Sequence, residues 1–189
     1  MSDPSSLTDA EVVVRTLENK EFFSNIVHRY EAKLSRYVRR LGIKNDDDII
    51  DVLQDIFIKI YKNLNAYDQS LPFSSWAYRI AHNEAITHFR RKNVRPEGNM
   101  ALDSHDIIET FASGDDLMKE LTQKDDGRIL REALTTLDAK YRDVIVLRYF
   151  EGKEYDEIAD ILEMPMGSVA TRLYRAKDQL KHLLVSKLP

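Results

Sequence analysis

The chain has no cysteine among its 189 residues. Disulfide bonds and thiolate metal sites are therefore excluded, which is typical of a protein from a reducing compartment. Glycine and proline are scarce, at six and five residues, and no long segment alternates apolar and polar residues as half-buried strands do. The sequence therefore predicts an all-α fold.

Long apolar runs are absent as well. No stretch approaches the roughly 18 consecutive apolar residues that a membrane-spanning helix needs. The first residues also lack the basic start and apolar core of a secretory signal. We expect a cytoplasmic protein that does not insert into a membrane.

Motifs of enzymes and metal sites are missing too. The five histidines show no HExxH-like spacing with acidic residues, and the chain has neither a glycine-rich phosphate loop nor a GxSxG turn. We therefore predict no enzyme activity, no catalytic residue, no metal site and no cofactor.

The net charge of −4 is concentrated in the middle of the chain. Residues 1–97 hold 15 basic and 14 acidic residues, residues 98–127 hold two and eight, and residues 128–189 hold 11 and 10. Basic clusters lie at residues 79–95 and 172–187. Each outer part therefore carries a candidate nucleic-acid surface, although the near balance of charge predicts weak DNA binding by the chain alone.

The spacing of apolar residues predicts the helices and the division into domains. Helices are expected at residues 9–18, 21–41, 46–64, 73–92, 129–137 and 141–150, followed by a helix-turn-helix. We predict two small helical domains, an N-terminal bundle at residues 1–95 and a C-terminal domain at residues 128–189. An acidic flexible linker at residues 96–127 joins them.

The expected helix at residues 46–64 has the clearest pattern. Its apolar stripe, expected to be buried, comprises Ile49, Leu53, Ile56, Phe57, Ile60, Tyr61 and Leu64. Asp51, Gln54, Asp55 and Lys59 lie away from that stripe. This polar face either docks a basic partner helix or is simply solvated.

Residues 155–176 have the pattern of a helix-turn-helix. Apolar residues recur at helical spacing before Pro165 and Gly167, which interrupt the pattern, and it resumes afterwards. The second helix is expected to bury Val169, Leu173, Ala176 and Leu180, and to expose Ser168, Thr171, Arg172 and Arg175 with Tyr174 and Lys177 at the flanks. Such a polar face suits the major groove of DNA. An ordinary helical hairpin with a solvated face is the alternative.

The expected helix at residues 73–92 interleaves basic and aromatic residues. One side carries Arg79, His82, Asn83, Ile86 and Arg90. This side fits single-stranded nucleic acid, and the preceding loop, residues 67–72, fits a base flipped out of the duplex. In the alternative reading, the aromatic residues belong to the core and the arginines keep the surface soluble.

Three segments together resemble a known family. DVLQDIFIKIYKNL at residues 51–64, FSSWAYRIAHNEAITHFRRK at residues 73–92 and the segment at residues 137–177 resemble regions two and four of the bacterial extracytoplasmic-function sigma factors. The resemblance implies a two-domain transcription initiation factor that binds core RNA polymerase, at the β′ clamp helices and the β flap. Its N-terminal domain would melt the minus-ten element of the promoter and capture one strand, and its C-terminal domain would read the minus-thirty-five duplex.

The resemblance also implies roles for individual residues. Those matching the polymerase-binding motif are Asp51, Gln54 and Asp55, with Ile50 in place of the usual first acid. Those matching the minus-ten site are Tyr67, Asp68, Gln69, Ser70, Phe73, Arg79, Asn83 and Arg90. Those matching the minus-thirty-five site are Pro165, Gly167, Ser168, Thr171, Arg172, Tyr174, Arg175 and Lys177, with Ala170 where the family often has Lys or Arg.

Two other readings of the sequence stay open. A stand-alone regulator could bind an operator as a dimer through its helix-turn-helix, but this reading does not account for the basic helix at residues 73–92. A purely structural adaptor would make both basic faces incidental. An anti-sigma protein is left open as a further partner.

Overall fold

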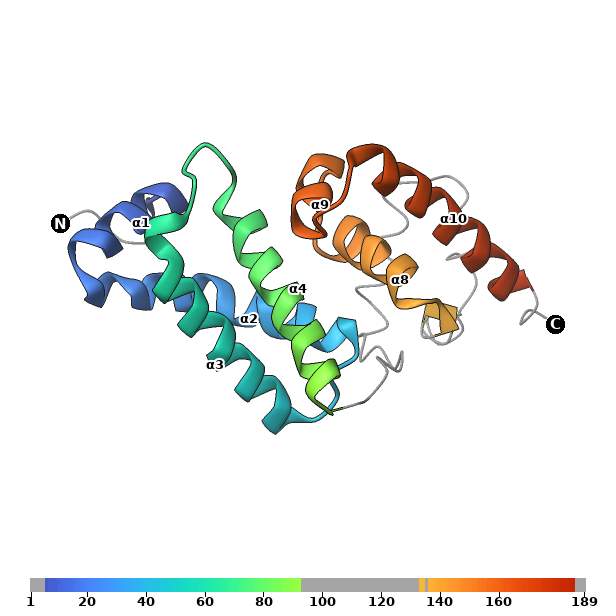
Figure 1. Cartoon of the computed structure of the whole chain (residues 1–189), viewed down its shortest axis with the longest axis horizontal. Helices are drawn as coiled ribbons and strands as arrows, with labels where there is room; N and C mark the ends of the chain where they lie inside the picture. Colours follow the sequence, from blue (N-terminus) through green and yellow to red (C-terminus); the bar gives the residue numbers. More distant parts are fainter. Residues whose placement is uncertain (1–5, 93–132, 135, 186–189) are drawn as a thin grey trace.

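The computed structural model describes residues 6–92, 133–134 and 136–185, and all regular secondary structure within them is helical (Figure 1). The first part of the chain forms α1 (Asp9–Glu18), η2 (Lys20–Phe22), α2 (Phe23–Leu41), α3 (Asp46–Asn63), η3 (Leu64–Ala66) and α4 (Phe73–Lys92). The second part forms α8 (Ala139–Ile145), η4 (Val146–Phe150), α9 (Tyr155–Ile161) and α10 (Met166–Val185). The predicted all-α fold is confirmed. The expected linker and most of the expected helix at residues 129–137 lie outside the described residues.

Local sequence accounts for where the first helices begin and end. Thr8 and Glu11 form a capping box at the start of α1, and the side chain of Asn45 accepts hydrogen bonds from the backbone N–H groups of the first turn of α3. Gly42 ends α2 in the left-handed region, at φ 118°, where a side chain would be strained. These caps hold the helices at the lengths that the N-terminal bundle needs.

The core of the N-terminal bundle lies between α2, α3 and α4. The face of α3 that enters it is centred on Val52 and Ile56, which are buried, whereas Tyr61 is 40% exposed. The predicted stripe was therefore wrong at Tyr61. Its ring instead makes an edge contact with Phe23, 5.0 Å between centroids, at the rim of the core.

The C-terminal helices enclose a second group of buried residues. Val144, Ile158, Val169, Leu173 and Leu180 are all fully or almost fully buried between α8, α9 and α10. Between α8 and α9 the chain makes a π-helical turn, η4, which is wider than an α-helical turn. No helix among the described residues combines the length and the apolar character needed to cross a bilayer.

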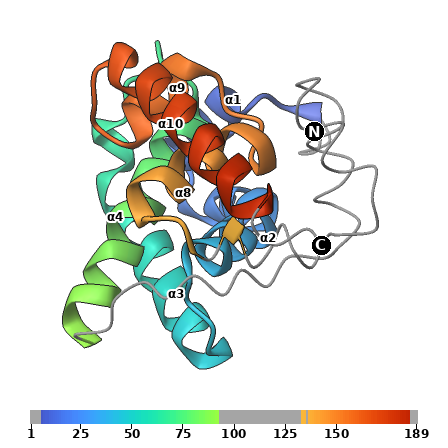
Figure 2. The ribbon, with the colours of Figure 1, turned by 90° about the vertical axis from the view of Figure 1, so that its right-hand side faces the viewer.

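The two domains pack together, with α4 beside α9 (Figure 1), and Figure 2 shows the C-terminal helices in front of the N-terminal bundle. Helix α4 therefore has neighbours on opposite sides, α3 on one and α9 on the other. This explains why its buried residues, which include Ser75, Tyr78 and Glu84, do not follow a single apolar stripe.

Candidate nucleic-acid interface

The turn between α9 and α10 differs in detail from the sequence interpretation. Glu163 is the residue with positive φ, at 50°, and Pro165 accepts hydrogen bonds from the backbone N–H groups of Ser168 and Val169. Because α10 begins at Met166, Gly167 lies inside the helix and does not interrupt it. A Cβ atom at Gly167 would meet no atom within 4 Å, so this side of α10 is open.

Helix α10 has two distinct faces. Val169, Leu173, Ala176 and Leu180 are buried, as predicted. Of the residues expected to contact DNA, Pro165, Gly167, Thr171, Tyr174 and Arg175 are exposed, and Ser168, Arg172 and Lys177 are half-buried. Tyr174 is 75% exposed. The exposed face thus combines a guanidinium, a hydroxyl and an aromatic ring on a rigid helix, which are groups that bind base edges and phosphates.

Arg172 lies near a buried carboxyl group, that of Asp143 on α8. Burial raises the pKa of Asp143 to about 7, and the positive charges of Arg142 and Arg172 only partly oppose the rise. Lys177 is also partly engaged, because its ammonium group lies 5.5 Å from the centre of the Tyr149 ring. Arg175, in contrast, has no ion pair or hydrogen bond within the described part of the chain.

Substitution of Asp143 by Asn should stabilise the protein at alkaline pH. The pKa of Asp143 is about 7 in the folded protein, against an ordinary value of 3.8, so between these values the folded state holds a proton that the unfolded state releases. The folded state therefore loses stability as pH rises through this window. We expect Asp143→Asn to be more stable than the wild type by roughly 1–3 kcal/mol at pH 8, with the difference vanishing near pH 4.

Chemical denaturation of both proteins between pH 4 and pH 8 measures this difference. Burial lowers the pKa of His82 to about 4, which makes stability rise with pH over part of the same range. That effect is shared by both proteins and cancels in the comparison. A difference that does not change with pH would contradict the assignment of Asp143 as a buried, protonated carboxyl group.

Residues 67–72 form a loop that lies, with the start of α4, on a cluster of aromatic side chains. Phe73 and Trp76 pack against Tyr67, with ring centroids 5.2 and 5.5 Å from it, and Tyr30 contacts Phe73 from α2. All four rings are buried. Tyr67 and Phe73, expected to contact a flipped base, therefore form the floor of the loop.

The upper part of the loop is exposed and held in shape by its own hydrogen bonds. Asp68, Gln69, Ser70 and Leu71 are all exposed. The carboxylate of Asp68 accepts from the backbone N–H of Ser70 at 2.9 Å, and this bond holds the pKa of Asp68 below its ordinary value. A rigid floor with an exposed polar rim is an arrangement that suits an extruded base.

The expected strand-binding residues of α4 differ in their surroundings. Asn83 and Arg90 are exposed. Arg79 is half-buried, and its Nη1 lies 2.8 Å from Oδ1 of Asp160 on α9. His82 is mostly covered, and its Nδ1 lies 3.2 Å from the hydroxyl of Tyr37. The C-terminal domain thus occupies part of the face that the sequence assigned to a DNA strand.

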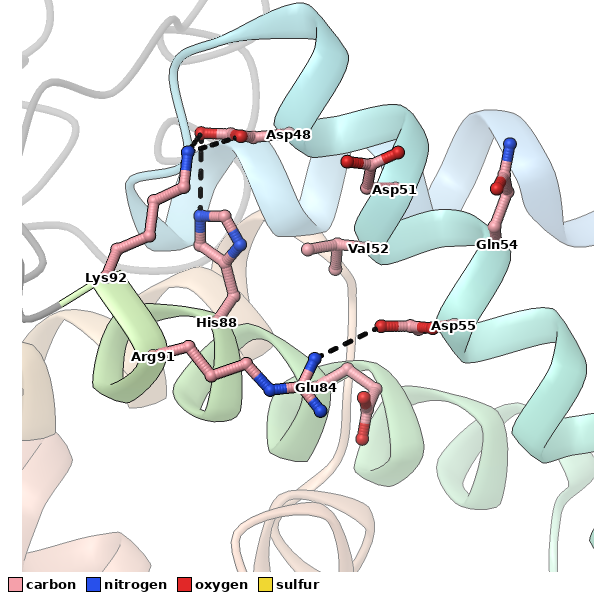
Figure 3. A pocket seen from close by; sticks show the side chains of 9 residues that line it. All are labelled: Asp48, Asp51, Val52, Gln54, Asp55, Glu84, His88, Arg91 and Lys92. Atoms are coloured by element: carbon pink, nitrogen blue, oxygen red, sulfur yellow. Dashed lines mark hydrogen bonds and ion pairs between the residues drawn. The ribbon is translucent and has the colours of Figure 1, made fainter.

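The expected polymerase-binding residues of α3 line a pocket of about 290 Å³ between α3 and α4 (Figure 3). Asp51 and Gln54 are exposed and Asp55 is half-buried. Arg91 Nη1 lies 3.6 Å from Oδ2 of Asp55, whereas the side chain of Gln54 points away from the basic residues of α4. Ile50, where the family usually has an acid, is 53% exposed.

Opposite charges meet at one end of this pocket, which the sequence interpretation did not foresee. Lys92 Nζ lies 2.6 and 2.7 Å from the carboxylate oxygens of Asp48, and Nε2 of His88 lies 3.6 Å from the same group (Figure 3). The acidic start of α3 and the basic end of α4 were each visible in the sequence. Only their antiparallel packing brings them together, and it neutralises part of the basic cluster at residues 79–95.

Two segments match known families. Residues 26–95 match the family described as Sigma-70 region 2, and residues 127–180 match the family described as Sigma-70, region 4. The first match includes most of α2 and all of α3 and α4, and the second includes α8, α9 and most of α10.

Similar proteins cover almost the whole chain. The ECF RNA polymerase sigma-E factor of Haemophilus influenzae is 31% identical over 181 residues, which are 93% of this chain and 95% of that protein. The solved structure of CnrH in complex with the cytosolic domain of CnrY has a TM-score of 0.68 at 24% identity, covering 95% of this chain and 99% of that one. The sigma factor RpoE of Bartonella quintana, solved with the anti-sigma factor NepR, has a TM-score of 0.62 at 19% identity, covering 88% and 98%. The two structures share the fold of this chain.

Proposed function

This chain belongs to the ECF RNA polymerase sigma factors, and from that membership we propose how its two domains recognise a promoter. As a sigma factor it is a transcription initiation factor and not an enzyme, and it works with RNA polymerase on promoter DNA. We propose that residues 128–189 read the minus-thirty-five element as duplex. Residues 1–95 would bind core polymerase and hold the melted minus-ten strand, with residues 96–127 as the linker.

The exposed face of α10 is the observation that carries this proposal. Arg175 and Tyr174 project from a helix whose opposite side is fixed in the core by Val169 and Leu173. Because the backbone of α10 cannot rotate without breaking those contacts, its polar side chains are pre-positioned for a groove.

The N-terminal domain is proposed to contribute two further contacts. The exposed rim of the loop, Asp68 to Leu71, together with Asn83 and Arg90, would hold an unpaired strand. Asp51, Gln54 and Asp55 would meet the β′ clamp helices, whose basic side chains suit carboxylate and amide acceptors. The β flap would be a contact of the C-terminal domain.

Arg175→Ala should weaken promoter recognition at one base position of the upstream element. A lost bidentate contact with a base costs about 1–3 kcal/mol, concentrated at that base. Arg172→Ala should also weaken recognition, but less selectively, because Arg172 is half-buried and near Asp143. In vitro transcription with core polymerase on a promoter library measures both effects.

Lys181→Ala is the matched control for these two variants. Lys181 is an exposed cation further along α10, so its loss should change transcription little and evenly across the library. Wild-type selectivity in both arginine variants would show that α10 does not read the groove.

We further propose that the protein acts in the bacterial cytoplasm, where RNA polymerase is found. An anti-sigma protein is the one expected partner without a surface assigned to it. The stand-alone regulator is disfavoured, because the similarity to sigma factors extends over both domains.

A further inference from the structure

Carboxylates of the C-terminal domain accept hydrogen bonds from side chains of the N-terminal domain. The two oxygens of Glu151 accept from Arg40 Nη1 and from the hydroxyl of Tyr78, each at 2.6 Å. Asp160 accepts from Arg79 at 2.8 Å. One carboxylate thus bridges α2 and α4, and the other holds a residue expected to contact DNA.

A third carboxylate of the C-terminal domain also contacts α4. Glu157 accepts from the hydroxyl of Ser75 at 2.9 Å and from Lys153 Nζ at 2.9 Å. Burial would raise the pKa of Glu157, but its hydrogen-bond donors outweigh that effect and hold it below the ordinary value. Glu157 and Lys153 therefore form an ion pair of the C-terminal domain that contacts Ser75 and Ser74 at the start of α4.

The donors on the N-terminal domain continue beyond the covered area along α2. Lys33, Arg36 and Arg40 are spaced by three and four residues, so they share one face of the helix over about 10 Å. Lys33 and Arg36 are exposed. Neither has an ion pair with any carboxylate of the described residues, although Lys33 Nζ lies 5.4 Å from the centre of the Tyr30 ring.

This row lies next to the covered face of α4. Glu151 accepts from Arg40 on α2 and from the Tyr78 hydroxyl on α4, so these two donors lie side by side, and the positive charge of Arg36 also opposes the rise in the pKa of Tyr78 that burial causes. The exposed cations Lys33 and Arg36 therefore share a helix face with Arg40, which is covered by the carboxylate of Glu151.

We propose that Lys33, Arg36 and Arg40 extend the strand-binding face of α4 onto α2 and bind phosphates of the single DNA strand, and that Glu151 and Asp160 occupy phosphate positions while the domains are packed together. This inference depends on the strand capture proposed above. Its occupant is a phosphodiester backbone, because carboxylate and phosphate oxygens accept the same charge-assisted hydrogen bonds from Arg. Arg and Lys side chains also track the backbone in single-strand sites.

Strand binding and domain packing exclude each other. The side chains of Arg40 and Glu151 are only 9% and 5% exposed, so a phosphate cannot reach Arg40 until Glu151 withdraws. The contacts that must break include the hydrogen bonds of Glu151 and Asp160 with Arg40, Tyr78 and Arg79, and domains of one chain commonly move relative to each other. The packed arrangement is therefore a state in which the strand-binding surface is filled by the protein's own carboxylates.

Fluorescence anisotropy of the full chain with a labelled DNA strand of random sequence, measured over a range of KCl concentrations, tests the binding surface. Lys33→Gln combined with Arg36→Gln should weaken binding about tenfold and reduce the slope of log K against log salt by about 1.4, since each phosphate contact on a single strand contributes about 0.7. Lys44→Gln with Lys62→Gln removes two exposed cations elsewhere and should leave the slope unchanged. Equal slopes of log K against log salt in the two double variants would show that α2 is not part of the strand-binding surface.

The same assay tests the role of the carboxylates. Glu151→Gln with Asp160→Asn should bind the strand at least about threefold more tightly, because fewer anions compete for Arg40 and Arg79. Affinity equal to or below that of the wild type would overturn the occupation of phosphate positions by carboxylates. Circular dichroism establishes that each variant is folded.

Arg90→Gln separates a failure of this inference from a failure of the proposed function. Arg90 belongs to the strand-binding face of α4 but not to the α2 row. If Arg90→Gln weakens strand binding while Lys33→Gln with Arg36→Gln does not, the role of α2 is wrong but strand capture by α4 stands. If neither variant weakens binding, strand capture by this domain falls as well.

Domain separation is measured independently by energy transfer. The absence of cysteine allows two labels to be placed, at Asn65→Cys and Gln179→Cys, both exposed and in different domains. Saturation with the strand should lower the transfer efficiency. If the strand binds saturably and the transfer efficiency does not change, strand binding and domain packing do not exclude each other.

Discussion

Replacement of Asp68, Gln69, Ser70 and Leu71 by a Gly-Ser segment is expected to slow promoter opening strongly while sparing the closed complex. These four residues form the exposed rim above the aromatic floor, so the change leaves Tyr67 and Phe73 in place. A base stacked in a preformed site is worth roughly 1–3 kcal/mol. Opening should therefore slow by about tenfold or more, since 1.4 kcal/mol corresponds to a factor of ten.

Permanganate footprinting of unpaired thymines and a gel-shift assay measure the two steps side by side. A premelted promoter should partly rescue the variant, because it removes the cost of opening but does not restore the lost contacts. Exchange of exposed residues Asn63 and Asn65 for Gly and Ser is a control in the segment just before the loop. Normal opening by the loop variant would withdraw strand capture from this site and leave the groove contact of α10 untouched.

Gln54→Ala combined with Asp55→Lys is expected to abolish binding to core polymerase without unfolding the protein. Asp55 is half-exposed, and its pair with Arg91 at 3.6 Å joins two side chains that are 50% and 70% exposed, so its loss costs little stability. At an interface, reversal of a paired charge costs about 2–5 kcal/mol. Binding in a pull-down should fall by roughly 30-fold or more.

Glu31→Lys is the control for that charge reversal, because Glu31 is exposed on α2 and outside the pocket between α3 and α4. Its binding to core polymerase should match the wild type. Retention of core polymerase by the Gln54 and Asp55 double variant, with normal circular dichroism, would place the polymerase contact on another helix.

Local sequence predicted most helices because their ends are set by neighbouring residues. The predicted and observed bounds of α1 and α4 are the same. Those of α3 differ by one residue, because the last residue expected in it begins η3. Gly167 was read as a helix breaker, since glycine is a poor helix former, but burial of Val169 and Leu173 outweighs that preference. Whether a glycine lies inside a helix thus depends on the packing of the whole domain, which no local sequence pattern indicates.

The site residues were predictable in kind but not in their surroundings. The chemistry of Arg175 on a polar face follows from helical spacing alone. The pairing of Arg79 with Asp160 joins residues 81 positions apart, and the burial of Asp143 depends on how α8 packs. The basic face of α4 follows from helical spacing, whereas the carboxylates of α9 that lie against it come from a distant part of the chain.

The number of residues in the π-helical turn η4 determines where the carboxylate of Glu151 lies. A π-helical turn contains one residue more than an α-helical turn would, and each residue turns a helix by about 100°. Glu151 follows directly after Val146–Phe150. Loss of a single residue there would restore regular α-helix and rotate Glu151 away from Arg40 and Tyr78, although every side chain of the contact remained. Deletion of one residue of η4 is thus expected to separate Glu151 from Arg40 and Tyr78 while the chain keeps all three side chains.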